Sequence, residues 1–365
     1  MNYKRVILIL LIVMICVVIY LSRDRIEQFT NKSIINLTNK IGGINDKLES
    51  NKKVGSIFVS IASYRDRKCI YTLKDLYLTA KNPEKIYVGI CQQNKLKSED
   101  CRIVEECIKE GLCVREQIKV INMDYKEAKG PAYARYLCST LYNNEDYYLQ
   151  IDSHINFTEN WDEKLIMMYN KINENNDDKK VISTYPLDYK DRNNKGVPYI
   201  CESMYNKYKN IPEFQSYIQE ASDKPKLTYI VACGFLFMPK KAVLDVPFDP
   251  YLPYLFMGEE VLLASRLWTN GYDIYSPNIN IVYHDYERKN EPKVWEDNKE
   301  FNKNNKEVIK KVRYLLGVGN INDVSLELLI DINKYGMGNK RSLEEYLEFG
   351  DLDVVNGKGS KKWCK

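Results

Sequence analysis

The sequence predicts an α/β fold with a mostly parallel central sheet. From Ser56 onward, short apolar, β-prone runs alternate with segments whose apolar residues recur at helical spacing. This alternation is typical of β–α–β units, in which a helix connects two parallel strands. Ligands of such sheets bind beyond the carboxyl ends of the strands, so polar residues at those ends are the first candidates for a functional site.

The first half of this region is expected to hold the regular units. The expected strands are short and rich in Ile, Val and Tyr: Ile57–Ala62, Ile86–Cys91, Ile118–Asn122 and the stretch Tyr147–His154. The expected helices are Cys69–Ala80, Ser98–Glu110 and Pro131–Leu141. Proline suits the first position of a helix, which supports a start at Pro131.

After residue 155 the alternation becomes less regular. Helices are expected over Trp161–Tyr169, Val261–Trp268, Val294–Leu315 and Ser342–Glu348, and strands over Val181–Thr184 and Tyr229–Met238. The segment Ile200–Lys226 is expected to be a loop. We therefore expect one α/β domain over residues 56–350, followed by a short tail over residues 351–365.

The N-terminal region has a different character. An unbroken apolar run, Val6–Leu21, follows Lys4 and Arg5. The run is slightly short for a spanning helix but suits a thin early-secretory membrane. A cleaved signal peptide is the alternative, although bulky residues stand where a cleavage site would need small ones. We expect residues 1–21 to be an uncleaved anchor with a short cytosolic flank, residues 22–55 to be a stem or linker, and the domain to face the ER or Golgi lumen.

The composition of the chain argues against some classes of function. The chain has 365 residues and a formal net charge of +4, which argues against a nucleic-acid binder. It has 10 cysteines but no Cys-x-x-Cys pair, so a zinc site of that type is not expected. Cys91, Cys138 and Cys233 lie in apolar runs, where free cysteine behaves as a small hydrophobic residue. The polar-region cysteines Cys101, Cys107 and Cys113 could include a disulfide.

A candidate metal site lies at the end of the stretch Tyr147–His154. Asp152 and His154 are two residues apart, so on an extended chain their side chains point the same way and can reach one ion. A carboxylate with an imidazole suits Mn²⁺ and its neighbours better than Mg²⁺. The chain has only 2 histidines, and His284 also ends an apolar, β-prone run, as a third ligand would. The alternatives are a polar strand end and core histidines.

Two further groups suit a nucleotide. Ser63-Tyr64-Arg65-Asp66 follows the first expected strand and could seat a nucleoside, with the aromatic ring on the base and the carboxylate on the base or ribose edge. The alternative is a charged helix N-terminus. Arg135 lies one helical turn after Pro131, and its forked donors suit a diphosphate. The alternative for Arg135 is an ordinary surface position.

Two carboxylates mark a helix start after Gly258. Glu259 and Glu260 could face a sugar hydroxyl or an acceptor, and the glycine would let the backbone come close. The alternative is a favourable interaction of two acidic residues with the helix dipole.

Taken in order, these motifs resemble the family of UDP-GlcNAc:polypeptide α-N-acetylglucosaminyltransferases. The resemblance runs from about Ser56 to about Gly350. It is carried by Ile61–Asp66, Lys129–Tyr136, Gln150–His154, Asn160–Asp162, Gly258–Glu260, Ser265–Asp273 and His284–Tyr286. One departure is Asn270, which stands where the family has histidine in a Thr-His-Gly-Tyr motif.

The resemblance implies a GT-A fold, UDP-GlcNAc as donor, Mn²⁺ as cofactor, and transfer with retention to a hydroxyl on a polypeptide, either hydroxyproline or Thr. It also implies roles for individual residues. Asp152, His154 and His284 would bind the metal, Asp66 the uridine and Arg135 the diphosphate, and Glu259 or Glu260 would lie near the reacting sugar. The alternatives are another UDP-hexose donor, a glycan acceptor, or a non-catalytic carbohydrate-binding relic of the fold.

Overall fold

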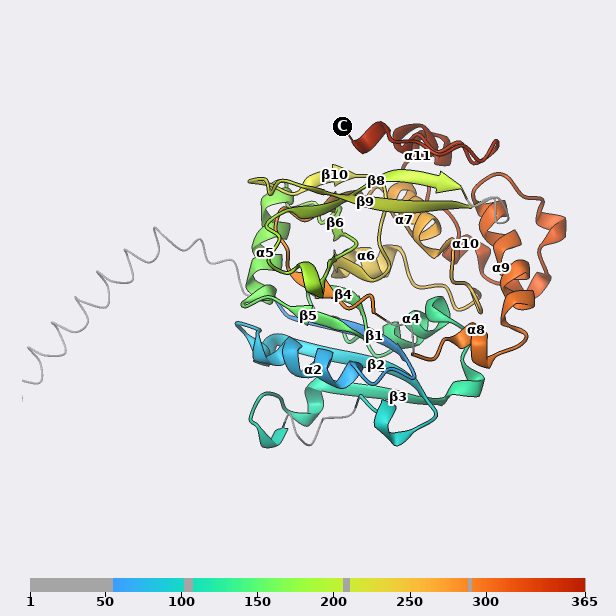
Figure 1. Ribbon diagram of the computed structural model, residues 1–365. Coiled ribbons are helices and arrows are strands. Elements are labelled where there is room, and N and C mark those ends of the chain that lie inside the picture. The colour runs from blue at the N-terminus through green and yellow to red at the C-terminus, as the bar shows by residue number, and fades with distance from the viewer. Residues whose placement is uncertain (1–54, 102–107, 206–210, 288–290, 365) are drawn as a thin grey trace, which may run out of the picture. The chain divides into compact units, whose positions relative to one another are not determined.

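The computed structural model describes residues 55–101, 108–205, 211–287 and 291–364 (Figure 1). The expected anchor over residues 1–21 and almost all of the expected stem lie outside these ranges. Within the described ranges, no helix is long and apolar enough to cross a membrane.

The central sheet has eight strands in the order β10-β12-β6-β11-β4-β1-β2-β3. Their bounds are β1 Ile57–Tyr64, β2 Ile86–Asn94, β3 Ile118–Asp124, β4 Tyr147–Asp152, β6 Lys180–Ser183, β10 Lys226–Thr228, β11 Phe235–Pro239 and β12 Asp273–Ser276. Strands β3, β2, β1 and β4 are parallel, as the connecting helices require, whereas β11 runs antiparallel to both β4 and β6. The α/β class is confirmed, and the sheet is mixed.

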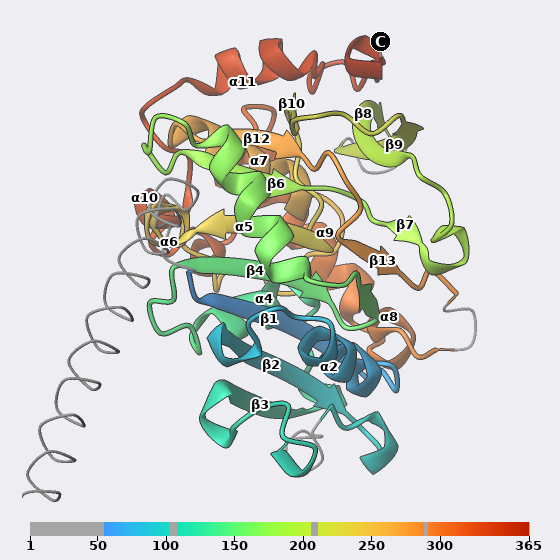
Figure 2. The same cartoon turned by 90° about the vertical axis from the view of Figure 1, so that its left-hand side faces the viewer.

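Helices cover both faces of the sheet. Their bounds are α2 Cys69–Leu78, α4 Pro131–Ser139, α5 Trp161–Ile172, α6 Lys240–Asp245, α7 Glu259–Thr269, α8 Val294–Asp297, α9 Phe301–Leu315, α10 Ile332–Tyr335 and α11 Leu343–Gly350. Val59 of β1 packs in the core that contains α2 and α5, whereas its neighbour Phe58 packs in the core of α4, α7 and α9. Figure 2 shows α2 and α5 in front of the sheet. Because both faces are covered, the central strands β1, β2 and β4 are buried over most of their length and rich in apolar residues, which is why the sequence reveals them.

Two smaller sheets complete the fold. Strand β13, Val282–His284, lies between β5, Ile155–Phe157, and β7, Leu187–Asp188. Its antiparallel pairing with β5 places His284 opposite Ile155, so a residue from late in the chain reaches the end of β4. Strands β8, Val197–Tyr205, and β9, Pro212–Gln219, form a separate hairpin.

Three expected elements differ in the structure. The expected loop Ile200–Lys226 is wrong, because it contains most of β8, all of β9 and the start of β10. Along β9, buried and exposed positions do not alternate regularly, so the segment lacks the two-residue period of a typical strand. The expected strand Tyr229–Met238 is regular only in β11, because the chain turns before it, where the Phe235 amide donates to the Ala232 carbonyl at 3.2 Å.

The expected helix Val294–Leu315 is divided into α8 and α9. Between the two helices, the Asn298 side chain accepts a hydrogen bond from the Glu300 amide at 3.0 Å. This bond competes with the backbone hydrogen bonds that would continue the helix. The expected helix Ser98–Glu110 falls partly on residues 102–107, outside the described ranges.

Disulfides join distant segments. Cys69 at the start of α2 pairs with Cys101, and Cys201 of β8 pairs with Cys364. Cys113 is also disulfide-bonded. The C-terminal residues pack beside the hairpin, where Ser360 forms an antiparallel bridge with Ser203 of β8, and the ring of Trp363 is centred 4.7 Å from that of Phe349 in α11. The three cysteines expected to be free, Cys91, Cys138 and Cys233, are free and buried.

Candidate functional site

A cavity of about 510 Å³ opens at the carboxyl ends of β1 and β4 and at the N-termini of α4 and α7. Helix N-termini and the ends of parallel strands are where an α/β fold binds anionic ligands. One part of the cavity wall is ionisable and is formed by Arg135, Asp152, His154, Glu259, Glu260 and His284. Another part is aromatic and is formed by Tyr64, Tyr185, Phe256, Tyr286 and Trp295.

The three candidate metal ligands converge in this cavity. Asp152 ends β4, His154 lies in the turn after it, and His284 ends β13. One ligand atom from each lies within 4.8 Å of the others. His284 Nε2 is 3.2 Å from Asp152 Oδ2, and the two imidazole rings meet edge to face with centroids 4.5 Å apart. The fold therefore unites residues 130 positions apart in the sequence.

The surroundings of these residues fit a divalent cation. Asp66 occupies the Nδ1 side of His154, which leaves Nε2 as the nitrogen that can ligate an ion. A Cβ at Gly234 would lie 2.8 Å from Asp152 Oδ2, so only glycine leaves room for the carboxylate in its observed position. One carboxylate with two imidazoles is a donor set that suits Mn²⁺ and similar transition metals.

Arg135 is buried behind this group. It donates to Glu259 through one terminal nitrogen and to Asp152 Oδ1 at 3.0 Å through the other. Burial disfavours its charge, but the carboxylates of Glu259 and Asp152 outweigh burial and raise the pKa of Arg135. Burial also acts to raise the pKa of Asp152, yet His284 and Arg135 hold it well below its usual value. Asp152 therefore remains an anionic carboxylate throughout the physiological pH range.

Glu259 and Glu260 begin α7 and lie in different environments. Glu259 faces Arg135, whereas Glu260 accepts hydrogen bonds from the Tyr185 hydroxyl and, at 3.0 Å, from the Cys233 amide. Burial raises the pKa of Glu260 to about 7, against the opposing effect of these hydrogen bonds. Glu260 can therefore exchange a proton near neutral pH.

The residues expected to seat a nucleoside divide into two groups. Tyr64 lines the cavity, and its hydroxyl donates to Asp297 at 2.7 Å. Ser63, Arg65 and Asp66 are not in the cavity wall. Arg65 has a left-handed φ of 48° and forms ion pairs with Glu99 and Asp297, and Asp66 is wholly buried.

Sequence reasoning makes no prediction for several residues of the cavity wall. Phe256 and Trp295 are 44% and 36% exposed and have ring centroids 4.9 Å apart. Tyr286 lies with its ring centroid 4.0 Å from that of His284. The only early signal for Trp295 is that tryptophan is rare in this chain, with 4 residues.

The family model described as Glycosyltransferase (GlcNAc) matches residues 56–112 and 104–356. No curated protein matches the chain.

Among solved structures, GalNAc-T7 with UDP, GalNAc and Mn²⁺ is similar, with a TM-score of 0.56 and 14% identity. The match covers 83% of this chain and 58% of the GalNAc-T7 chain, so this chain spans less than two thirds of that relative. S. aureus TarS 1–349 in complex with UDP-GlcNAc matches with a TM-score of 0.46 and 14% identity, over 73% of this chain and 68% of TarS.

The likeness to GalNAc-T7 shows a shared fold, and the family model covers almost the whole α/β domain with the cavity and its ionisable residues. The chain therefore belongs to the GlcNAc glycosyltransferase family.

Proposed function

We propose that this glycosyltransferase moves N-acetylglucosamine from UDP-GlcNAc to a hydroxyl of a polypeptide, on hydroxyproline or Thr, with retention and with Mn²⁺ as cofactor. The observation that carries the proposal is the convergence of Asp152, His154 and His284 beside Arg135. The family description supports GlcNAc as the sugar. The resemblance of the ordered motifs to polypeptide transferases supports the acceptor.

Asp152, His154 and His284 would hold the cation through one carboxylate and two imidazoles. When bound, Mn²⁺ supplies Lewis-acid stabilisation of the diphosphate that leaves the sugar. The transfer breaks the bond between the anomeric carbon and the diphosphate oxygen, and it forms a bond from that carbon to the acceptor oxygen on the same face. The acceptor proton leaves with the departing UDP.

The remaining residues have separate tasks in this proposal. Arg135 provides fixed positive charge in a partly desolvated wall, where charge stabilisation is strong because it needs no reorganisation. Glu259 keeps Arg135 in place. Glu260, hydrogen-bonded to Tyr185 and the Cys233 amide, is oriented toward the cavity and would contact the sugar or the acceptor hydroxyl.

The location of the enzyme belongs to the same proposal. We expect residues 1–21 to anchor it as a single-pass type II protein, with the domain in the ER or Golgi lumen. The disulfides Cys69–Cys101 and Cys201–Cys364 support an oxidising compartment, because such bonds are rare in the cytosol.

The test is UDP release by the full-length protein from a panel of UDP-sugars, with and without Mn²⁺. We expect hydrolysis of UDP-GlcNAc that requires Mn²⁺ and is lost in His154→Ala. Asp191→Asn removes an exposed carboxylate outside the cavity wall and should match the unmodified protein. A preference for another UDP-hexose would replace the donor. Absence of both hydrolysis and UDP binding would identify a non-catalytic relic.

A further inference from the structure

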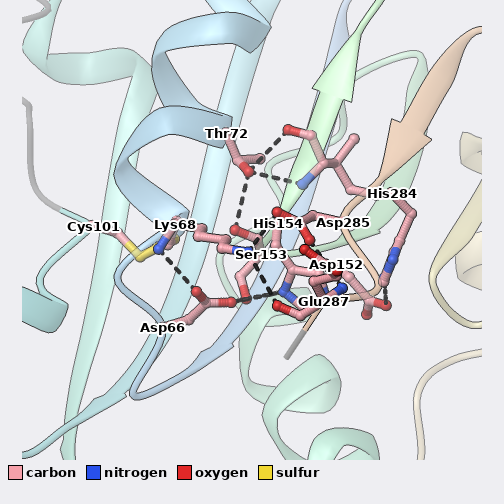
Figure 3. A network of polar contacts seen from close by, with 12 residues as sticks. Asp66, Lys68, Thr72, Cys101, Asp152, Ser153, His154, His284, Asp285 and Glu287 are labelled. Carbon is pink, nitrogen blue, oxygen red and sulfur yellow. Dashed lines mark hydrogen bonds and ion pairs between the residues drawn. A yellow bond between two sulfur atoms is a disulfide. The ribbon is translucent and has the colours of Figure 1, made fainter. Parts of the chain in front are cut away.

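The segment before α2 contacts the histidine that follows β4. Asp66 has a wholly buried side chain, and its Oδ2 lies 2.7 Å from His154 Nδ1 (Figure 3). The Ser153 hydroxyl donates to the same oxygen at 2.7 Å. The other oxygen, Oδ1, accepts the Lys68 amide at 2.9 Å. A carboxylate with these partners is fixed in place and fixes the imidazole that it contacts.

The same segment also reaches the second histidine strand. Lys68 Nζ forms an ion pair with Asp285 Oδ2 at 2.5 Å, and Asp285 directly follows His284. The Asp285 amide donates to the His154 carbonyl at 3.1 Å, so the two histidine segments are also joined to each other. Asp66 and Lys68, two positions apart, thus hold the two histidine segments from one side.

The first turn of α2 adds a third attachment. The Thr72 hydroxyl accepts the Ile155 amide at 2.9 Å and lies 3.0 Å from the carbonyls of both Ser153 and Ile155. These contacts fix the backbone on either side of His154. The Cys69–Cys101 disulfide, buried at both ends, ties the start of α2 to the segment after β2.

We propose that Asp66 and Lys68 are positioning residues for the metal site. Asp66 accepts a hydrogen bond from His154 Nδ1–H, which sets the tautomer and leaves Nε2 for the cation. Lys68 holds the end of β13 through Asp285 and thereby places His284. The inference rests on the metal site of the proposed function, and it assigns Asp66 to the histidine instead of to uridine. Partners of this kind commonly change metal affinity by about 10–100-fold when they are removed.

The experiment uses the full-length protein with two readouts. The first is Mn²⁺ affinity, measured by electron paramagnetic resonance of the free ion. The second is ¹⁵N NMR of the imidazole nitrogens at pH 8, where imidazole is ordinarily neutral. The chain has 2 histidines, so both rings can be assigned by comparison with His154→Ala.

Asp66→Asn should weaken Mn²⁺ binding by about 10–100-fold and shift His154 from the Nδ1–H tautomer toward a mixture. Asp75→Asn is the matched control, because Asp75 lies on α2, just after the segment that holds Asp66, and its carboxylate accepts the Phe157 backbone amide instead of contacting a histidine. This control should change neither readout. Lys68→Gln removes the positive partner of Asp285 from a partly exposed ion pair, so this variant should fold normally. It should weaken Mn²⁺ binding a few-fold.

The outcomes separate the two proposals. If the unmodified protein does not bind Mn²⁺, the metal part of the proposed function is overturned. If the unmodified protein binds Mn²⁺ and Asp66→Asn retains both that affinity and the tautomer, the positioning role is overturned while the proposed function stands. If Asp66→Asn does not fold, an unchanged Mn²⁺ affinity in Lys68→Gln overturns the role of this segment.

Discussion

Arg135 and Glu259 form a buried ion pair whose guanidinium also reaches Asp152. One side chain on α4 therefore links the end of β4 to the start of α7. Only a planar fork of donors can satisfy two carboxylates in this way, since an ammonium group is a single point of charge.

We therefore expect Arg135→Lys to fold but to lose about 10–100-fold in kcat, because the positive charge that we propose for diphosphate stabilisation would be misplaced. UDP release at saturating UDP-GlcNAc would measure this loss. Arg192→Lys, at an exposed position, should retain full activity. Full activity in Arg135→Lys would show that the pair only stabilises the fold.

Gly234 leaves no room for a side chain beside Asp152. In Gly234→Ala the new methyl group would meet Asp152 Oδ2 at 2.8 Å and turn the carboxylate away. We expect Mn²⁺ affinity to fall by roughly 10–100-fold, as it does when ligand orientation is lost. Isothermal titration with Mn²⁺ would measure the change.

Gly111→Ala is a suitable control for general loss of stability in that experiment. Gly111 has a φ of +70°, so alanine is strained there, but its Cβ would meet nothing within 4 Å. This variant should be less stable and still bind Mn²⁺ normally. Normal binding by Gly234→Ala would mean that Asp152 moves aside without consequence.

Glu260 makes stability depend on pH. Its folded pKa of about 7 lies above the ordinary value of 4.5, so the folded state binds more protons than the unfolded state between these values. The contribution of protonated Glu260 to the free energy of unfolding is complete below pH 4.5 and is lost as the pH rises toward and through 7. The size of this effect is on the order of 1–3 kcal/mol, since one pKa unit corresponds to about 1.4 kcal/mol.

Glu260→Gln should therefore flatten the decrease in unfolding free energy between pH 5 and pH 8. Urea unfolding at several pH values would measure it, with the exposed Glu163→Gln as control. A pH profile identical to that of the unmodified protein would contradict the assignment of this proton to Glu260.

Lys311 and Asp249 form an ion pair with no solvent exposure, 2.6 Å apart. Burial lowers the pKa of Lys311 despite the attraction of Asp249. Asp249→Asn should reduce the unfolding free energy by about 3–5 kcal/mol, because it leaves a buried charge without its partner.

The double variant Asp249→Leu/Lys311→Met should recover much of that loss, because two apolar side chains need no counter-charge. Urea unfolding of Asp249→Leu, of Lys311→Met and of the double variant forms the required cycle. Additive losses in the double variant would contradict a direct coupling between the two side chains.

Much of the fold could be predicted because β1, β2 and β4 are buried on both faces over most of their length and are therefore rich in apolar residues. Strand β9 was missed because its polar residues obscure the pattern. The sequence placed Asp152 beside His154 through strand periodicity, and the scarcity of histidine pointed to His284. The structure brings these three together.

Contacts between distant residues could not be predicted in this way. The partnership of Asp66 with His154 joins positions 88 apart and depends on how α2 packs against β5. The space beside Gly234 depends on the register of β11 against β4. A local pattern carries no information on either, because both are properties of tertiary packing.

The pairing of Cys201 with Cys364 has a consequence for the order of events in the cell. Cys364 is synthesised 163 residues after Cys201, so this crosslink can form only once Cys364 has left the ribosome. The Cys69–Cys101 crosslink can close while synthesis continues. The half that carries Asp152 can thus be crosslinked early, whereas Cys201 of β8 keeps an unpaired thiol until Cys364 emerges. A chain that stops before Cys364 would leave Cys201 without this partner.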